Sequence, residues 1–258
     1  MTVSEAPAPA ELIDAAVALA REGGAMALAA FEGVPGSVSY KADGSVVTET
    51  DRAVEAMLRQ RIASLFPEDA IIGEEHGARQ GTSGRRWLID PIDGTEAFVH
   101  GVPEWSTLVA VEDEAGVQVG VIDVPALRET LWAGKGRGAF LNGEPTAVGD
   151  ATDPSGAYVA TSDLDDWPDT VVAAARHARL RPRTWGGGYG IGLAVSGRVD
   201  AFVDYKVDVW DVAPAAILAA EAGGRFCAFD GSEKLDRGTC LVTNATLRDP
   251  LLEIFSEA

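Results

Sequence analysis

Apolar residues recur at the spacing of an α-helix near the start of the chain. Residues 11–31 carry apolar side chains three or four positions apart, which predicts an amphipathic helix, although Gly23 and Gly24 interrupt the pattern. A polar turn at 41–45 follows, and a second apolar repeat that begins at Asp51 predicts another helix. The chain is therefore predicted to begin with a helix, a turn and a helix.

From residue 70 the apolar runs become short and rich in β-branched and aromatic residues, with turn signals between them. This pattern predicts one mostly antiparallel sheet that ends in the glycine-rich segment 135–145. A polar stretch at 150–155 suits a domain boundary, so we divide the chain into an N-terminal α+β domain at 1–150 and a C-terminal domain at 151–258. Beyond the boundary, strand-like and helix-like segments alternate, which is typical of an α/β layer.

The charge of the chain limits its partners. Its 258 residues include 40 Asp and Glu against 21 Lys and Arg, a formal net charge of -19. A field of this sign repels phosphate backbones and acidic lipid surfaces, so we expect neither nucleic acid nor a membrane as a partner. A solvated surface explains most of this acid, and the sharper alternative is that some of it holds cations.

Two further features bear on the cellular compartment. Cys227 and Cys240 form no CxxC pair, and the first residues carry acids and prolines where a secretory signal needs basic and apolar residues. No uncharged run reaches the roughly 18 apolar residues of a membrane span. We therefore expect a reducing, cytoplasmic location, without a disulfide framework or a structural zinc site.

The most informative segment is WLIDPIDGTEAF at 87–98. A strand that looks buried ends in Asp90 and Asp93, and two acids three positions apart around a proline can face one point. Hard cations such as Mg²⁺ prefer oxygen ligands, and an Asp that bridges two ions is a common basis of a binuclear site. Gly94 and Thr95 would offer backbone N–H groups to a phosphate at a helix start. A simple turn explains this motif alone about equally well.

Three other acidic motifs lie at strand ends or helix starts. GEEHG contains Glu74 and Glu75, VWDVAP contains Asp211, and TETD contains Asp51. Each motif alone is more simply explained as a helix cap or an exposed loop acid. Because these motifs and DPIDGT share this placement, a common functional site becomes a better explanation than four separate caps or loop acids.

In this order and at this separation, GEE, DPIDGT and WDVAPAAILAAEAGG resemble the signature blocks of the inositol monophosphatase superfamily of Mg²⁺-dependent, lithium-sensitive phosphatases. The resemblance runs from Lys41 to the strands after Gly224. It implies a layered αβαβα sandwich of the inositol monophosphatase and fructose bisphosphatase type, with the active site between the two halves. It also implies a homodimer that acts on a small phosphorylated metabolite.

The resemblance assigns metal ligands as well. Glu74, Asp90 and the carbonyl of Ile92 would hold one ion, whereas Asp90, Asp93 and Asp211 would hold a second. A third, weaker ion would lie near Glu74, so each active site would contain two to three Mg²⁺ ions. This assignment agrees with the chemistry, because metal ions lower the pKa of bound water from 15.7 toward about 7 and clamp the attacking and leaving oxygens.

Catalytic and phosphate-binding roles follow from the same resemblance. The Thr95 hydroxyl, oriented by Asp51, would position the attacking water and help to deprotonate it, with Glu74 as a catalytic metal ligand. The backbone of Gly94 and Thr95 would hold the phosphate. Lys41 matches an auxiliary position near the metals.

Substrate choice must be sought outside these shared blocks. The run FVHGVPEWSTLVAV at 98–111, and Arg183 with Gly186 three positions later, look more like the histidinol-phosphate phosphatase branch than the inositol branch. Asp204, seven residues before Asp211, matches a position that faces the substrate in that branch. An acid there suits the ammonium group of histidinol, although related inositol enzymes use a similarly placed Glu for a sugar hydroxyl.

The chain also departs from the pattern of that branch. Glu96 and Ala97 replace the Lys-Asn or Thr-Asn that usually follows DGT, and Gly187 stands where the branch commonly has Asp. Three hypotheses therefore stay open: a histidinol-phosphate phosphatase of histidine biosynthesis, an inositol-1-phosphate or broader sugar phosphatase, and a catalytically silent metal- or phosphate-binding protein. Loss of a metal ligand or of Thr95 would mark the third, and none is lost.

Overall fold

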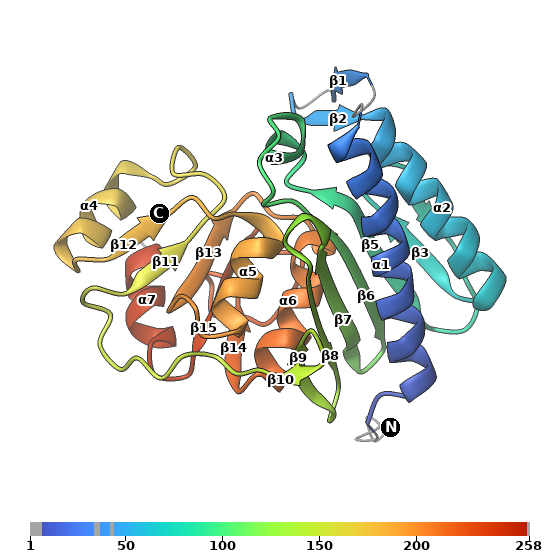
Figure 1. Cartoon of the computed structure of the whole chain (residues 1–258). Helices are drawn as coiled ribbons and strands as arrows, with labels where there is room; N and C mark the ends of the chain where they lie inside the picture. Colours follow the sequence, from blue (N-terminus) through green and yellow to red (C-terminus); the bar gives the residue numbers. More distant parts are fainter. Residues whose placement is uncertain (1–6, 34–36, 42–43, 257–258) are drawn as a thin grey trace.

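A computed structural model describes residues 7–33, 37–41 and 44–256. In these ranges two large sheets alternate with three layers of helices (Figure 1), which confirms the αβαβα sandwich. The helices are α1 (Ala10–Glu32), α2 (Glu49–Leu65), α3 (Thr95–Val99), α4 (Asp169–His177), α5 (Gly187–Val195), α6 (Val209–Glu221) and α7 (Arg248–Phe255). A short 3-10 helix spans Pro125–Leu127.

The first sheet has eight strands. In spatial order they are β10 (Glu144–Pro145), β9 (Gly138–Leu141), β8 (Glu129–Gly134), β7 (Gly116–Val124), β6 (Ser106–Asp113), β5 (Arg86–Asp93), β3 (Ala70–Gly73) and β4 (Gly77–Arg79). Every neighbouring pair is antiparallel except β3 with β5, so the prediction of a mostly antiparallel sheet is confirmed. The glycine-rich segment 135–145, expected only to end this block, contributes the two strands β9 and β10.

Helices α1 and α2 cover one face of this sheet, as Figure 1 shows. The predicted helix at 11–31 is confirmed, and α1 runs unbroken through Gly23 and Gly24. A Cβ atom added at Gly24 would lie 2.2 Å from Oδ2 of Asp123, and one at Gly23 would lie 3.1 Å from Thr107. The two glycines therefore allow α1 to approach the sheet closely.

A hairpin of β1 (Val38–Tyr40) and β2 (Val46–Thr48) precedes α2. The sequence predicted only a turn here, and residues 42–43 of that turn lie outside the described residues. Helix α2 begins at Glu49, two residues before the expected start. Thr48 is its N-cap and forms a capping box with Asp51, which fixes both the helix start and the Asp51 side chain.

The second sheet has five strands, in the order β12 (Arg181–Arg183), β11 (Tyr158–Ala160), β13 (Ala201–Tyr205), β15 (Thr239–Asn244) and β14 (Gly224–Cys227). The pairs β12–β11 and β11–β13 are parallel and the others antiparallel. The sequence did not predict β12. Residues 146–157 connect the two sheets, and the division of the chain at residue 150 stays a prediction.

The apolar core follows the layers. One buried cluster lies between α1, α2 and the first sheet, a second surrounds α5 and α6 between the sheets, and a third lies beneath α4 and α7. Cys227 and Cys240 are free and buried in different clusters. None of the helices in the described ranges combines the length and the apolar character that a membrane crossing needs.

Candidate active site

The predicted site begins where strand β5 ends. The pairing of β5 with β6 is irregular between Asp90 and Asp93, at the proline of the motif. The backbone N–H of Ile92 donates to Oδ1 of Asp90 at 3.1 Å. This turn places Asp90 and Asp93 on the same side, although they stand near the end of a strand whose side chains otherwise alternate between faces.

Asp211 completes an acidic cluster with these two residues. One carboxylate oxygen from each of Asp90, Asp93 and Asp211 lies within 4.8 Å of the others. Asp211 stands in the first turn of α6, where it accepts a hydrogen bond of 2.7 Å from the backbone N–H of Asp208. Among the residues that the structure describes, none of the three carboxylates has an ion-pair partner.

Burial is the main cause of the altered titration of this cluster. It raises the pKa of Asp90 well above 3.8, and the charges of Glu74, Asp93 and Asp211 add to the effect. Burial followed by the charge of Asp93 does the same to the pKa of Asp211. Converging acids without a cation are costly, and an all-oxygen donor set suits a hard divalent cation. The residues present therefore fit a metal of the Mg²⁺ type.

Glu74 follows β3 and meets Lys41. The Lys41 Nζ atom lies 2.5 Å from Oε1 of Glu74 and 2.7 Å from Oε1 of Glu75. Burial raises the pKa of Glu74, and its hydrogen bond with Lys41 opposes the rise. The Glu74 carboxyl also forms a hydrogen bond with Asp90, which connects this ion pair to the three-acid cluster.

Glu55, which the sequence analysis missed, supports the turn that carries Glu74. Its fully buried carboxylate accepts the backbone N–H of Glu75 at 2.6 Å and that of His76 at 3.0 Å, and it pairs with Arg59 at 2.6 Å. An acid within the apolar face of α2 was the signal that could have revealed it.

Thr95 and Asp51 meet as the resemblance implied. The Thr95 hydroxyl lies 3.2 Å from Oδ1 of Asp51 and 2.9 Å from the carbonyl oxygen of Ile92. Oδ2 of Asp51 accepts the backbone N–H of Thr48 at 2.9 Å. Gly94, the N-cap of α3, has a φ of 82°, a conformation that favours glycine. The side chains of Thr95 and Asp51 thus form the hydrogen bond that the resemblance implied.

Asp93 also accepts hydrogen bonds from both halves of the chain. Its Oδ2 atom accepts the Ser106 hydroxyl at 2.8 Å and the backbone N–H of Gly188 at 2.5 Å. Gly187 has a φ of 55°, and a Cβ atom there would lie 2.3 Å from Oδ2 of Asp93. Because glycine has no Cβ atom, Gly187 leaves room for the Asp93 carboxylate in this backbone conformation.

Asp204 is close to the cluster but is occupied by hydrogen bonds. It accepts the Thr161 hydroxyl at 2.9 Å, the backbone N–H of Ser162 at 2.7 Å and the Ser162 hydroxyl at 2.5 Å. Burial raises the pKa of Asp204 to about 7. Ser162 in turn accepts the backbone N–H of Gly187 at 2.9 Å. Sequence reasoning missed Ser162, because nothing distinguishes it from other loop serines.

A cavity of about 170 Å³ lies beside the cluster, and Asp93, Asp204 and Asp211 line it. Two predicted substrate contacts are not in its lining. Arg183 lies with its guanidinium 5.1 Å from the ring centre of Tyr158, and it donates to the carbonyl of Pro182. Gly186 is the N-cap of α5 and packs closely against Ser162, which lines the cavity, since a Cβ atom at Gly186 would lie 2.6 Å from the Ser162 Cα atom. Glu96 and Ala97 lie on α3, outside the cavity lining.

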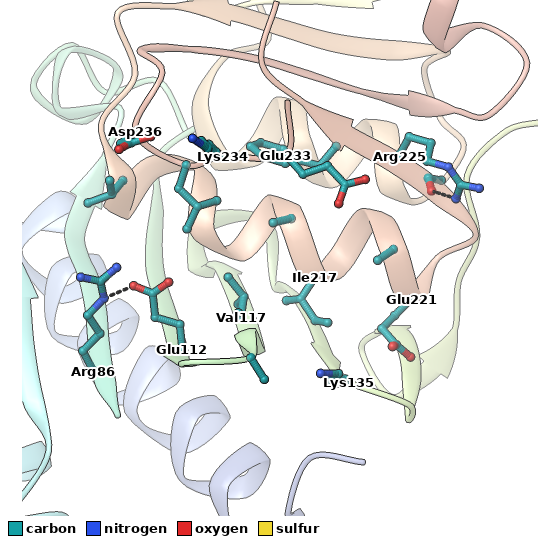
Figure 2. Close-up of a pocket in the computed structure, with 18 residues that line it drawn as sticks. Arg86, Glu112, Val117, Lys135, Ile217, Glu221, Arg225, Glu233, Lys234 and Asp236 are labelled. Atoms are coloured by element: carbon teal, nitrogen blue, oxygen red, sulfur yellow. Dashed lines mark hydrogen bonds and ion pairs between the residues drawn. The ribbon is translucent and has the colours of Figure 1, made fainter. Parts of the chain in front are cut away.

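A larger groove of about 800 Å³ lies elsewhere, between α6, β14 and the first sheet (Figure 2). Its lining mixes four acids with four bases, and Arg86 forms an ion pair with Glu112. Glu221 accepts the backbone N–H groups of Gly136 and Gly138 at 2.7 Å each. None of the predicted site residues lines this groove, so the smaller cavity is the candidate active site.

Comparison with known proteins identifies the family of the chain. The model of the inositol monophosphatase family matches residues 8–257. A histidinol-phosphatase of Chlorobaculum parvum is 39% identical over 234 residues, which cover 88% of this chain and 90% of that protein. A histidinol-phosphatase of Mycobacterium tuberculosis is 34% identical over 246 residues, covering 92% and 95%. The structure of a Thermotoga maritima IMPase matches with a TM-score of 0.83 and 31% identity, covering 96% of this chain and 97% of that one. The chain belongs to the inositol monophosphatase family.

Proposed function

We propose that this chain, a phosphatase of the inositol monophosphatase family, hydrolyses histidinol phosphate with the help of Mg²⁺. One observation carries the proposal that the site is catalytic: Asp90, Asp93 and Asp211 converge within 4.8 Å beside a cavity. The hydrogen bond between Thr95 and Asp51 supports the assignment of hydrolysis, since a binding protein needs no such pair.

The cluster supplies the proposed metal ligands. Asp90, Asp93 and Asp211 would hold one ion, and Glu74 with Asp90 and the carbonyl of Ile92 would hold another. Mg²⁺ bound there would supply an acidified water and would neutralise the charge on the phosphate oxygens. Both proposed ions would contact Asp90, whose pKa burial raises, so Mg²⁺ binding should oppose that rise and favour the ionised carboxylate.

Residues of the chain itself would orient the reactants. Thr95 would accept a hydrogen bond from the attacking water while its own hydroxyl donates to Asp51. The backbone N–H groups of Gly94 and Thr95 would hold phosphate oxygens. Lys41, which forms an ion pair with Glu74, would limit the negative charge that the substrate meets.

The choice of histidinol phosphate rests on two supports. Relatives that are 39% and 34% identical over most of the chain are named histidinol-phosphatases. Of the four acids that line the cavity, Asp93 and Asp211 are proposed metal ligands and Asp204 accepts three hydrogen bonds. Asp166 is therefore the acid left to favour a leaving alcohol that carries positive charge. An inositol or sugar phosphate is the second candidate, because the Thermotoga maritima IMPase shares the fold with 31% identity.

The test measures phosphate release from histidinol phosphate, inositol-1-phosphate, fructose-1,6-bisphosphate and adenosine 3',5'-bisphosphate, with Mg²⁺ and with EDTA. Asp93→Asn serves as the blank. A kcat/KM for histidinol phosphate about a hundredfold above the others supports the proposal, and such ratios are within reach of one binding pocket. Preference for an inositol or sugar phosphate supports the second candidate. Absence of turnover on all four substrates would favour a silent binder.

The predicted homodimer and cytoplasmic location stay proposals. Light scattering on the purified protein gives the molar mass, which for a homodimer is twice the 26.9 kDa of one chain. A mass of one chain at the concentrations used for the activity assay would contradict the dimer.

A further inference from the structure

The cavity beside the acidic cluster is lined by a pair of opposite charges that no predicted role explains. Asp166 and Lys206 both line it, and Nζ of Lys206 forms an ion pair with Oδ1 of Asp166. Asp166 belongs to the loop after β11, whereas Lys206 belongs to the connection between β13 and α6. The pair therefore bridges the two loops that border the cavity.

The remaining acids of the cavity are already engaged. Asp93 and Asp211 belong to the proposed metal cluster. Asp204, the acid that the sequence suggested for the substrate, accepts three hydrogen bonds from Thr161 and Ser162 and is only 5% exposed. Its oxygens therefore fix the loop after β11 and are poorly placed to meet a cation.

Asp166 differs from these acids in accessibility. Its side chain is 26% exposed, and its partner Lys206 is 78% exposed. An ion pair with so exposed a cation contributes little and exchanges readily for another cation. Lys206 has a φ of 57°, a backbone conformation that lysine rarely adopts, and its ammonium group reaches Asp166 from the connection between β13 and α6.

We infer that Asp166 is the specificity residue that binds the ammonium group of the substrate, with Lys206 occupying that position in the absence of substrate. This inference rests on the proposed function. The substrate would be a phosphomonoester whose leaving alcohol carries an ammonium group. Its phosphate would lie at the acidic cluster and its ammonium group in the same cavity, where it replaces the Lys206 ammonium on Asp166.

The substrate's cation and Lys206 compete for one carboxylate, which gives two variants with opposite effects. Asp166→Asn removes the partner of the ammonium group, so the ratio of kcat/KM for histidinol phosphate over inositol-1-phosphate should fall by about tenfold or more, mainly through KM. Lys206→Met removes the competitor, so the same ratio should rise. A purely structural bridge between the loops predicts the same direction for both variants.

Asp165→Asn is the matched control. Asp165 has the same charge one position away, is exposed and does not line this cavity, so its removal should leave the ratio unchanged. If the wild-type protein turns over histidinol phosphate and Asp166→Asn keeps its ratio, the role of Asp166 is refuted and the proposed function stands. A wild-type protein that does not hydrolyse histidinol phosphate refutes the proposed function and this inference with it.

Discussion

The backbone N–H of Gly188 donates a 2.5 Å hydrogen bond to Oδ2 of Asp93, although 95 positions separate the two residues. The bond joins the start of α5 to the end of β5. Because the Ser106 hydroxyl also donates to Oδ2, the other oxygen of Asp93 remains for the acidic cluster. A residue of the second half of the chain thus orients an acid of the first.

Asp93→Asn tests the acidic cluster. The amide oxygen can still accept from Ser106 and Gly188, but the charge is lost, so we expect turnover with Mg²⁺ to fall by about a thousandfold or more. The charge of Asp93 raises the pKa of both Asp90 and Asp211, so its removal relieves repulsion. In EDTA the variant should therefore melt at the same temperature as the wild type or higher, as measured by thermal unfolding.

The control for that variant is Asp236→Asn, which removes an acid from the separate groove in Figure 2. It should retain full turnover and the rise in melting temperature that Mg²⁺ gives the wild type. An Asp93→Asn protein with unchanged turnover would contradict the assignment of the metal site.

Thr95 offers a second test, which separates water positioning from metal binding. Thr95→Val removes the hydroxyl that contacts Asp51 and the carbonyl of Ile92, while Thr95→Ser keeps it. We expect the Val variant to lose about a hundredfold or more in kcat and the Ser variant to lose much less. Both should still gain melting temperature with Mg²⁺. Equal rates for the two variants would show that the hydroxyl has no role.

Gly187→Ala should disturb the site through Asp93. A Cβ atom would lie 2.3 Å from Oδ2 of Asp93, so the carboxylate must move and the Mg²⁺ concentration for half-maximal activity should rise by about tenfold. Gly223→Ala is the matched control, since Gly223 also has a positive φ, of 80°, but has no atom near its Cβ position. Both variants should lose about 1 kcal/mol of stability from the strained backbone. A normal Mg²⁺ dependence of Gly187→Ala would count against this reading.

Asp123 should make the stability of the fold depend on pH. Burial raises the pKa of its carboxyl from 3.8 to about 6, against the opposing effects of Thr130 and Arg21. Between these values the folded state binds more protons than the unfolded state, so stability falls as pH rises, by at most about 3 kcal/mol. Asp123→Asn lacks this titration.

Urea unfolding of both proteins between about pH 4 and pH 7 measures this effect. The free energy of unfolding of Asp123→Asn, relative to the wild type, should increase over that interval and level off above it. The difference between pH values is the relevant quantity, because the amide also changes the contact with Thr130 by a constant amount. Parallel pH profiles for the two proteins would contradict the raised pKa.

Local sequence patterns were sufficient for much of the fold. Short β-branched runs predicted the first sheet, and the glycine-closed apolar repeat after Asp211 predicted α6. The strand Arg181–Arg183 was missed because two arginines and a proline are unfavourable in strands, and an edge position is what permits them. Gly23 and Gly24 interrupt the apolar pattern of α1, and the reason for them lies on the opposing sheet, which the local pattern does not show.

Local sequence patterns also predicted part of the candidate site. Asp90, Asp93 and Thr95 belong to one short motif, so their proximity follows from the chain itself. The bonds from Gly188 to Asp93 and from Ser162 to Asp204 join segments far apart in sequence. Backbone N–H groups carry no residue signature, and a loop serine is common, so neither contact has a local signal.

Helix α6 is enclosed by both sheets, and Asp211 stands on its first turn. Its apolar residues, including Ile217 and Leu218, are buried between the layers. Amide protons in such a helix exchange with deuterium only when the whole molecule opens. The buried body of the helix that carries Asp211 therefore stays formed while the surface loops fluctuate locally.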